Sequence, residues 1–230
     1  MTNMKNLILT VFSILFMLSD GNTQDWPNLQ RFQSANAALA SPTIDESRVV
    51  FMGNSITEGW LQDSLTLFDN PAYINRGISG QTTPQMLIRF RQDVIELEPQ
   101  VVVILAGIND IAGNTGPSTL EMITDNIFSM AELASANDIE VILCSVLPAL
   151  DFPWRPGLKP AVQVVELNNS LRSYAKANGH IYADYFSPMV DEQLGLQAVL
   201  TYDGVHPNVS GYLVMEPIIK AAIERALQRK

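Results

Sequence analysis

The chain has 230 residues, of which 47% are hydrophobic and 17% are charged, and its formal net charge is −10 at pH 7. A chain of this length and apolar content can bury a substantial core, which excludes general disorder and favours a single domain. The negative charge and the lack of a lysine or arginine cluster disfavour nucleic acid and anionic membrane surfaces as partners, because phosphate groups would repel such a chain.

The N-terminal residues predict export. Lys5 precedes an apolar run over 7–18 (LILTVFSILFML), which small and polar residues follow. This layout is typical of a secretory signal peptide, and the run is shorter than the ~20 apolar residues of a membrane-spanning helix. We therefore expect a signal peptide over about 1–21 and a single domain over 22–230. The alternative is that the run forms a buried first helix of the domain.

Cysteine usage is consistent with a soluble exported product. Cys144 is the only cysteine, so no intramolecular disulfide can form, and its apolar surroundings predict a small core residue. No cysteine follows the apolar run directly, so the lipid attachment of bacterial lipoproteins is not expected. We expect a secreted or periplasmic protein without a stable membrane anchor; the sequence does not indicate its oligomeric state.

Apolar segments and helical patterns alternate along the chain. The expected strands span 48–53, 72–77, 101–107, 140–146 and 180–185, and the middle ones are continuously apolar, as in a parallel sheet covered on both faces. Helices are expected over 83–97, 118–137, 161–179 and 210–228, with a short one over 28–39. Ser118 and Glu121 have capping-box spacing. The pattern predicts an α/β fold, a three-layer αβα sandwich with a central parallel sheet of about five strands.

One long irregular segment interrupts this alternation. Residues 147–160 contain four prolines together with Phe152 and Trp154. Long loops without secondary structure are often functional. An equally good interpretation is a rigid surface excursion that packs on its own side chains.

Polar motifs follow the expected strands. Ser55 follows the first strand, RGISGQT (76–82) the second and GIND (107–110) the third, while YDGVHPN (202–208) precedes the last helix. In open parallel sheets, ligands bind beyond the carboxyl ends of the strands. We therefore expect these four segments to meet at one edge of the sheet.

The residues in these motifs have complementary chemistry. His206 could remove the proton of the Ser55 hydroxyl, and Asp203 could orient the imidazole ring. The backbone N–H groups of Ser55 and Gly80 and the side-chain amide of Asn109 could stabilise an oxyanion. Taken singly, the serine is more often a helix cap, the asparagine a turn former and the D-x-x-H pair incidental or part of a metal site. Together they predict an acyl-transfer site.

Four motifs resemble the blocks of the GDSL esterases and lipases, also called SGNH hydrolases: GNSITEG (53–59), NRGISGQT (75–82), GIND (107–110) and DGVHP (203–207). The resemblance covers most of the chain beyond the signal-like run. It implies an SGNH-hydrolase, flavodoxin-like fold. It also implies that Ser55 is the nucleophile, Gly80 and Asn109 are oxyanion-hole donors, His206 is the base and Asp203 its orienting partner.

The first block departs from the usual family pattern. Asn54 stands where the family usually has an aspartate, so the charge is lost while the shape and one acceptor are kept. Thr57 stands where a G-x-S-x-G motif would end in glycine, which disfavours the nucleophile elbow of the α/β-hydrolases. Neither residue belongs to the expected triad.

We therefore expect a secreted serine esterase that hydrolyses carboxylic esters through an acyl-enzyme. His180 begins an expected strand without a carboxylate partner and is interpreted as structural, and no histidine or cysteine cluster suggests a metal or cofactor. Short-acyl esters such as O-acetylated carbohydrates are the favoured substrates, and no nucleic-acid partner is expected. A lysophospholipase or thioesterase of the same family is the alternative. A non-catalytic module that binds a glycan or acyl group is the alternative of another class.

Overall fold

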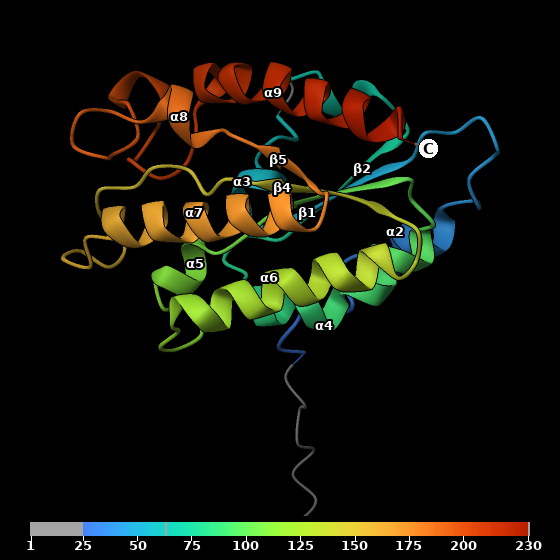
Figure 1. Cartoon of the computed structure of the whole chain (residues 1–230), viewed down its shortest axis with the longest axis horizontal. Helices are drawn as coiled ribbons and strands as arrows, with labels where there is room; N and C mark the ends of the chain where they lie inside the picture. Colours follow the sequence, from blue (N-terminus) through green and yellow to red (C-terminus); the bar gives the residue numbers. More distant parts are fainter. Residues whose placement is uncertain (1–24, 63, 230) are drawn as a thin grey trace, which may run out of the picture.

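The computed structural model describes residues 25–62 and 64–229, and in these ranges the sheet has five parallel strands in the order β2-β1-β3-β4-β5 (Figure 1). The strands are β1 (Val49–Gly53), β2 (Tyr73–Gly77), β3 (Val101–Leu105), β4 (Glu140–Cys144) and β5 (Ile181–Ala183). Each lies within its predicted range, so the expected parallel sheet is confirmed. The expected signal peptide lies outside the described residues.

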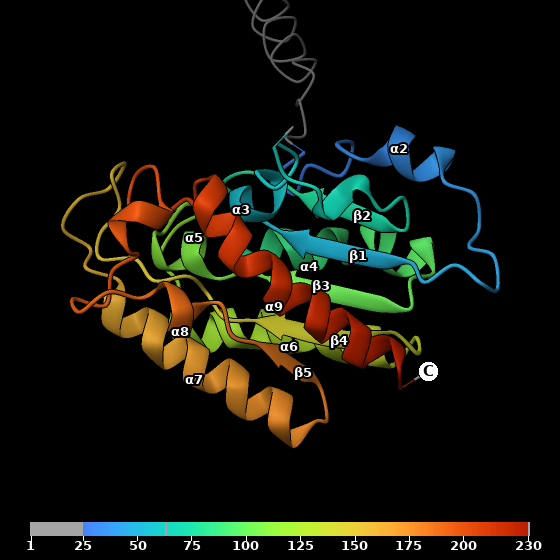
Figure 2. The same ribbon diagram turned by 90° about the horizontal axis from the view of Figure 1, so that it is seen from above.

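Helices cover both faces of the sheet (Figures 1 and 2). One layer contains α4 (Thr83–Asp93), α6 (Leu120–Ser135) and α7 (Ala161–Ala177), and the other contains α8 (Phe186–Met189) and α9 (Val209–Leu227). Val50 and Met52 of β1 point into the first core, whereas Val49 and Phe51 point into the second. Burial on both faces explains why the strands read as continuous apolar runs. Within the described ranges, none of the helices is long and apolar enough to span a membrane.

Short helical elements connect the larger ones. They are α2 (Gln33–Ala38), α3 (Ser55–Glu58), α5 (Ile108–Ile111) and the 3₁₀ turns η1 (Leu67–Asp69), η2 (Ile95–Leu97) and η3 (Ala198–Leu200). The helix expected over 28–39 is thus restricted to α2. The helix expected over 83–97 ends at Asp93, because the backbone of Val94 leaves the helical region before η2 begins.

The capping box predicted at Ser118 and Glu121 is wrong. Thr119 is the N-cap of α6, and its hydroxyl accepts a 3.2 Å hydrogen bond from the N–H of Met122. The backbone of Thr119 is extended, with φ −88° and ψ 160°, so the helix begins at Leu120. A capping box does occur at α4, between Thr82 and Gln85. Serine and threonine both cap helices, so the Ser118–Glu121 spacing alone did not identify the cap.

The strand order brings the predicted motifs to one edge. Gly53 at the end of β1 pairs in register with Gly77 of β2 and with Leu105 of β3, so the three strands end at the same level. The chain moves from β1 outward to β2 and then returns to β3 on the other side of β1. Such a switch point is where ligands bind in open α/β sheets. The segments that follow β1 and β3 flank it.

Candidate active site

Ser55 begins α3 directly after β1, and the helix cap is its neighbour Asn54. The side-chain oxygen of Asn54 accepts a 3.0 Å hydrogen bond from the N–H of Ile56. The Ser55 hydroxyl is therefore not needed as a cap, and its Oγ lies 3.0 Å from Nε2 of His206. The two residues are 151 positions apart in the sequence, and the packing of the fold brings them together.

His206 is held by Asp203 in the turn before α9. Oδ2 of Asp203 lies 2.8 Å from Nδ1 of His206. The other carboxylate oxygen, Oδ1, accepts hydrogen bonds from the backbone N–H groups of Val205 at 3.0 Å and His206 at 2.8 Å. The carboxylate thus contacts both the ring and the backbone of the same histidine. The structure brings Ser55, His206 and Asp203 into one hydrogen-bonded chain.

The surroundings of Asp203 favour its ionised form. Partial burial acts to raise the pKa of its carboxyl, but hydrogen bonds from the backbone and ring of His206 and from the Val205 N–H outweigh this effect. The pKa of Asp203 therefore lies below its ordinary value. The side chain of His206 is 34% exposed, so solvent and a substrate can reach it.

The expected oxyanion-hole residues lie on the segments that follow β1, β2 and β3. Gly80, between β2 and α4, has φ +77°, a backbone conformation that glycine adopts without steric cost. Asn109 in α5 is 4% exposed, and its Nδ2 donates a 2.9 Å hydrogen bond to the carbonyl of Gln81. An amide carries two N–H donors, so this bond uses one of them. Ser55 is the first residue of α3, where N–H groups have no acceptor within the helix.

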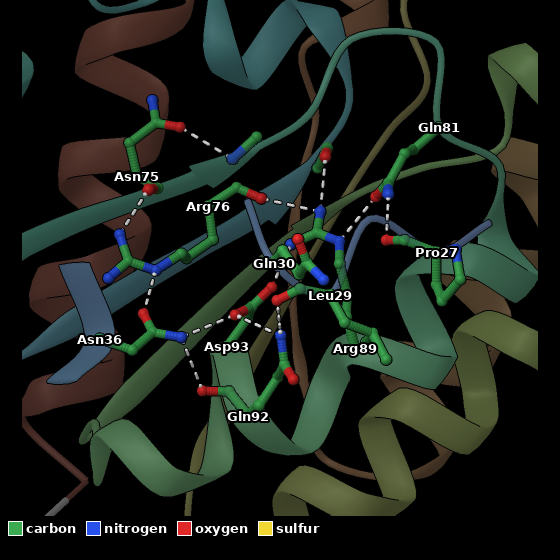
Figure 3. A network of polar contacts seen from close by, with 12 residues as sticks. Pro27, Leu29, Gln30, Asn36, Asn75, Arg76, Gln81, Arg89, Gln92 and Asp93 are labelled. Atoms are coloured by element: carbon green, nitrogen blue, oxygen red, sulfur yellow. Dashed lines mark hydrogen bonds and ion pairs between the residues drawn. The ribbon is translucent and has the colours of Figure 1, made fainter. Parts of the chain in front are cut away.

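A buried arginine beneath these loops was not singled out from the sequence. Arg89 of α4 is 0% exposed and donates hydrogen bonds to the side chain of Gln81 at 2.6 Å and to the carbonyls of Arg76 at 2.8 Å and Gly53 at 3.2 Å (Figure 3). It also forms a 3.1 Å ion pair with Asp93. These bonds connect the ends of β1 and β2 to the loop that carries Gly80. An arginine between apolar helix positions is the sequence signal that could have revealed it.

Asp110 has a supporting position that the sequence did not reveal. Its buried carboxylate accepts hydrogen bonds from the N–H of Thr83 at 3.0 Å and from the Thr83 hydroxyl at 2.6 Å. These bonds join α5 to the first turn of α4. Burial raises the pKa of Asp110 to about 6, although the hydrogen bonds from Thr83 act in the opposite direction.

The asparagine at position 54, where the family usually has an aspartate, changes the hydrogen bonds of the turn after β1. Its Oδ1 makes the capping bond that a carboxylate oxygen could also make. Its Nδ2 is buried, and among the described residues it has no hydrogen-bond partner. The substitution therefore keeps the turn after β1 at the cost of an unsatisfied donor.

The irregular segment 147–160 reaches the site. The ring of Trp154 lies 5.8 Å from the ring of His206, measured between centroids. The sequence indicated that this loop was unusual but did not place it beside the histidine. The segment thus places an aromatic side chain beside the hydrogen-bonded chain of Ser55, His206 and Asp203.

Two other reactive side chains, Cys144 and His180, lie away from the candidate active site. Cys144 is buried in the core as expected, and burial raises the pKa of its thiol to about 12. His180 precedes β5 at the opposite end of the strand from the site and packs against Tyr174, with 5.8 Å between ring centroids. Over 25–62 and 64–229, no group of three or more His, Cys, Asp or Glu side chains is arranged to hold a metal ion.

Residues 51–214 match the model of the GDSL-like Lipase/Acylhydrolase family. The chain belongs to this family. Membership places this GDSL-family protein among the carboxylic ester hydrolases. The match includes all five residues that the sequence motifs predicted for the site.

Solved structures with similar folds support the assignment. A GDSL-like lipase from Bacteroides thetaiotaomicron VPI-5482 is 52% identical with a TM-score of 0.84, and the alignment covers 87% of this chain and 98% of that one. A Bacteroides fragilis NCTC 9343 protein, described by name as an acylhydrolase, is 50% identical with a TM-score of 0.86, covering 89% and 99%. The acetylxylan esterase of Xylanibacter ruminicola is 26% identical over 229 residues, which span 81% of this chain but 45% of that enzyme.

Proposed function

We propose that this GDSL-family protein is a serine esterase in which Ser55 is the nucleophile, His206 the general base and Asp203 the residue that orients the imidazole. The distances of 3.0 Å from Ser55 Oγ to His206 Nε2 and 2.8 Å from His206 Nδ1 to Asp203 Oδ2 are the observation that supports it. A hydroxyl becomes an effective nucleophile when an adjacent base accepts its proton.

The reaction proceeds in two acyl-transfer steps. Ser55 Oγ attacks the ester carbonyl while its proton passes to Nε2 of His206, and Asp203 stabilises the imidazolium. The tetrahedral oxyanion accepts hydrogen bonds from the backbone N–H groups of Ser55 and Gly80 and from the Asn109 amide. The bond to the alcohol then breaks, and the alcohol oxygen takes the proton from His206. Water hydrolyses the acyl-serine by the same route and releases the acid.

We propose short-acyl esters of carbohydrates, acetyl esters above all, as the substrates. The relative named acetylxylan esterase supports this choice. The net charge of −10 also disfavours strongly anionic substrates. Longer acyl chains, lysophospholipids and thioesters are the competing substrates in the test.

The test compares p-nitrophenyl acetate hydrolysis by the wild type and Ser55→Ala, with Ser118→Ala as a control for an unrelated serine. We expect Ser55→Ala to lower kcat by about 10³-fold or more and Ser118→Ala to leave it unchanged. Equal, slow hydrolysis by wild type and Ser55→Ala would refute the serine mechanism and favour a binding module. Acetyl, butyryl and octanoyl esters then test chain length; a kcat/KM that rises with length contradicts the short-acyl proposal.

We also propose that the protein is exported. The apolar run over 7–18 with Lys5 before it supports this proposal. Mass spectrometry of the protein from fractionated cells tests it, and we expect a mature chain that lacks the run. A full-length chain confined to the cytoplasm would contradict export.

A further inference from the structure

The loop over 147–160 is fixed by its own polar contacts. The carboxylate of Asp151 accepts hydrogen bonds from the N–H groups of Phe152 at 3.0 Å and Gly157 at 2.7 Å. Arg155 donates to the carbonyl of Ala112 at 2.6 Å, which ties the loop to the end of α5. Phe152 is 1% exposed and anchors the loop in the core. These contacts hold the loop in a defined position.

The side chain of Trp154 extends from this loop beside His206, the proposed base. Its ring centroid lies 5.2 Å from that of buried Phe152 and 5.8 Å from that of His206. Even with both contacts, Trp154 is 44% exposed. An apolar indole surface thus faces solvent immediately next to the imidazole. Packing of the loop alone does not require a side chain of this size to be exposed there.

The proposed mechanism determines which part of the substrate meets Trp154. The alcohol oxygen must receive its proton from Nε2 of His206, so it lies within about 3 Å of that nitrogen. The group attached to this oxygen consequently lies beside the imidazole, within reach of the indole. The oxyanion, by contrast, is directed toward Gly80 and Asn109.

The charges near the loop indicate which alcohol groups of an ester can bind beside Trp154. A cavity of about 380 Å³ next to the loop has a mostly apolar lining that includes Leu150, Phe152, Pro153 and Leu196, and three aspartates, Asp151, Asp191 and Asp203, also line it. Carboxylates repel the phosphate of a lysophospholipid headgroup or of coenzyme A. A neutral polyol is compatible with both features, because it has no charge for the carboxylates to repel and its C–H face can pack on an aromatic ring.

From these contacts we infer that Trp154 is a specificity-determining residue that stacks on a sugar ring in the alcohol part of the substrate. This inference rests on the proposed esterase function. It assigns the alcohol part to a neutral pyranoside, and it gives the aromatic loop a role in substrate recognition.

The test uses Trp154→Ala and Trp154→Phe, with Leu158→Ala as a matched control that truncates another exposed apolar side chain of the loop. Each enzyme is assayed with a mono-O-acetyl xylo-oligosaccharide and with ethyl acetate, whose alcohol part is too small to stack. We expect Trp154→Ala to lower the ratio of the two kcat/KM values about tenfold, mainly through KM for the sugar ester. Trp154→Phe should retain most of the ratio, and Leu158→Ala all of it.

Several outcomes would overturn the inference. An unchanged ratio in Trp154→Ala, or a better turnover of a lysophospholipid than of the sugar ester, contradicts stacking on a sugar. Binding of the unacetylated xylo-oligosaccharide to Ser55→Ala, measured by calorimetry, provides a readout independent of hydrolysis. Loss of this binding in Ser55→Ala/Trp154→Ala supports the inference even if the esterase mechanism fails, and unchanged or undetectable binding counts against it.

Discussion

The side chain of Gln81 accepts a 2.6 Å hydrogen bond from Nε of the fully buried Arg89. Gln81 also donates from Nε2 to the carbonyl of Pro27 at 2.7 Å, and its own backbone carbonyl accepts the 2.9 Å bond from Asn109 (Figure 3 shows the first two contacts). Gln81 thus joins the N-terminal segment, helix α4 and the proposed oxyanion-hole residue.

We expect Gln81→Ala to lower kcat about tenfold with a smaller change in KM. The side chain of Gln81 holds the loop whose carbonyl accepts from Asn109, so without it the Asn109 amide is less firmly positioned for the oxyanion. The control is Gln92→Ala, which removes a similar side-chain bond of 2.7 Å to the carbonyl of Leu29 without touching Asn109. Both variants should lower Tm, but Gln92→Ala should leave kcat unchanged. An equal loss of kcat in both variants would contradict the positioning role of Gln81.

Removing the proposed amide donor should have a larger effect. We expect Asn109→Ala to lower kcat by about 10²–10³-fold with little change in KM, because the amide acts mainly on the oxyanion of the transition state. Steady-state kinetics with p-nitrophenyl acetate measure this split. A rise in KM at constant kcat would instead assign Asn109 to ground-state binding.

The rate should depend on the protonation of a single imidazole. We expect kcat/KM to fall at acid pH, since protonated His206 cannot accept the Ser55 proton. The hydrogen bonds from His206 and Val205 hold the pKa of Asp203 below its ordinary value, so its carboxylate stays ionised at neutral pH. Asp203→Asn should lower kcat by about 10²–10⁴-fold. A flat profile for the wild type would exclude His206 as the base.

The raised pKa of Asp110 predicts that the free energy of unfolding depends on pH. Because burial raises the pKa of Asp110 to about 6, the folded state favours its protonated form. Its contribution to the free energy of unfolding is fully present below its ordinary pKa and is lost as the pH rises through about 6. The total change is about 3 kcal/mol.

Denaturant unfolding of the wild type and Asp110→Asn at pH 4.5 and 7.5 measures the larger part of this contribution, about 2 kcal/mol. The asparagine can still accept from Thr83 but does not titrate, so the wild type should lose stability relative to the variant as the pH rises. Other carboxylates cancel in this difference. A pH-independent difference between the two proteins would contradict the shifted pKa of Asp110.

Local physical chemistry was sufficient to predict the five strands and the longer helices of the fold. Continuous apolar runs such as that of β3 predict strands because both faces of a parallel sheet are buried, and the helices between them follow from spacing that lines one face with apolar residues. The ends of the elements were less predictable. The N-cap of α6 is Thr119 rather than Ser118, and the sequence did not decide between them because either hydroxyl residue can cap a helix.

The sequence by itself determined which reactive residues the site can contain and that Ser55, Gly80 and Asn109 follow successive strands. The strands that precede them end at one edge of the sheet, because parallel strands in register have their carboxyl ends at the same level. Only the tertiary structure decided that His206 lies 3.0 Å from Ser55, that Arg89 supports the loops and that Trp154 lies beside His206. Such contacts join segments far apart in the chain, and they depend on how helices and loops pack on the sheet rather than on local residue patterns.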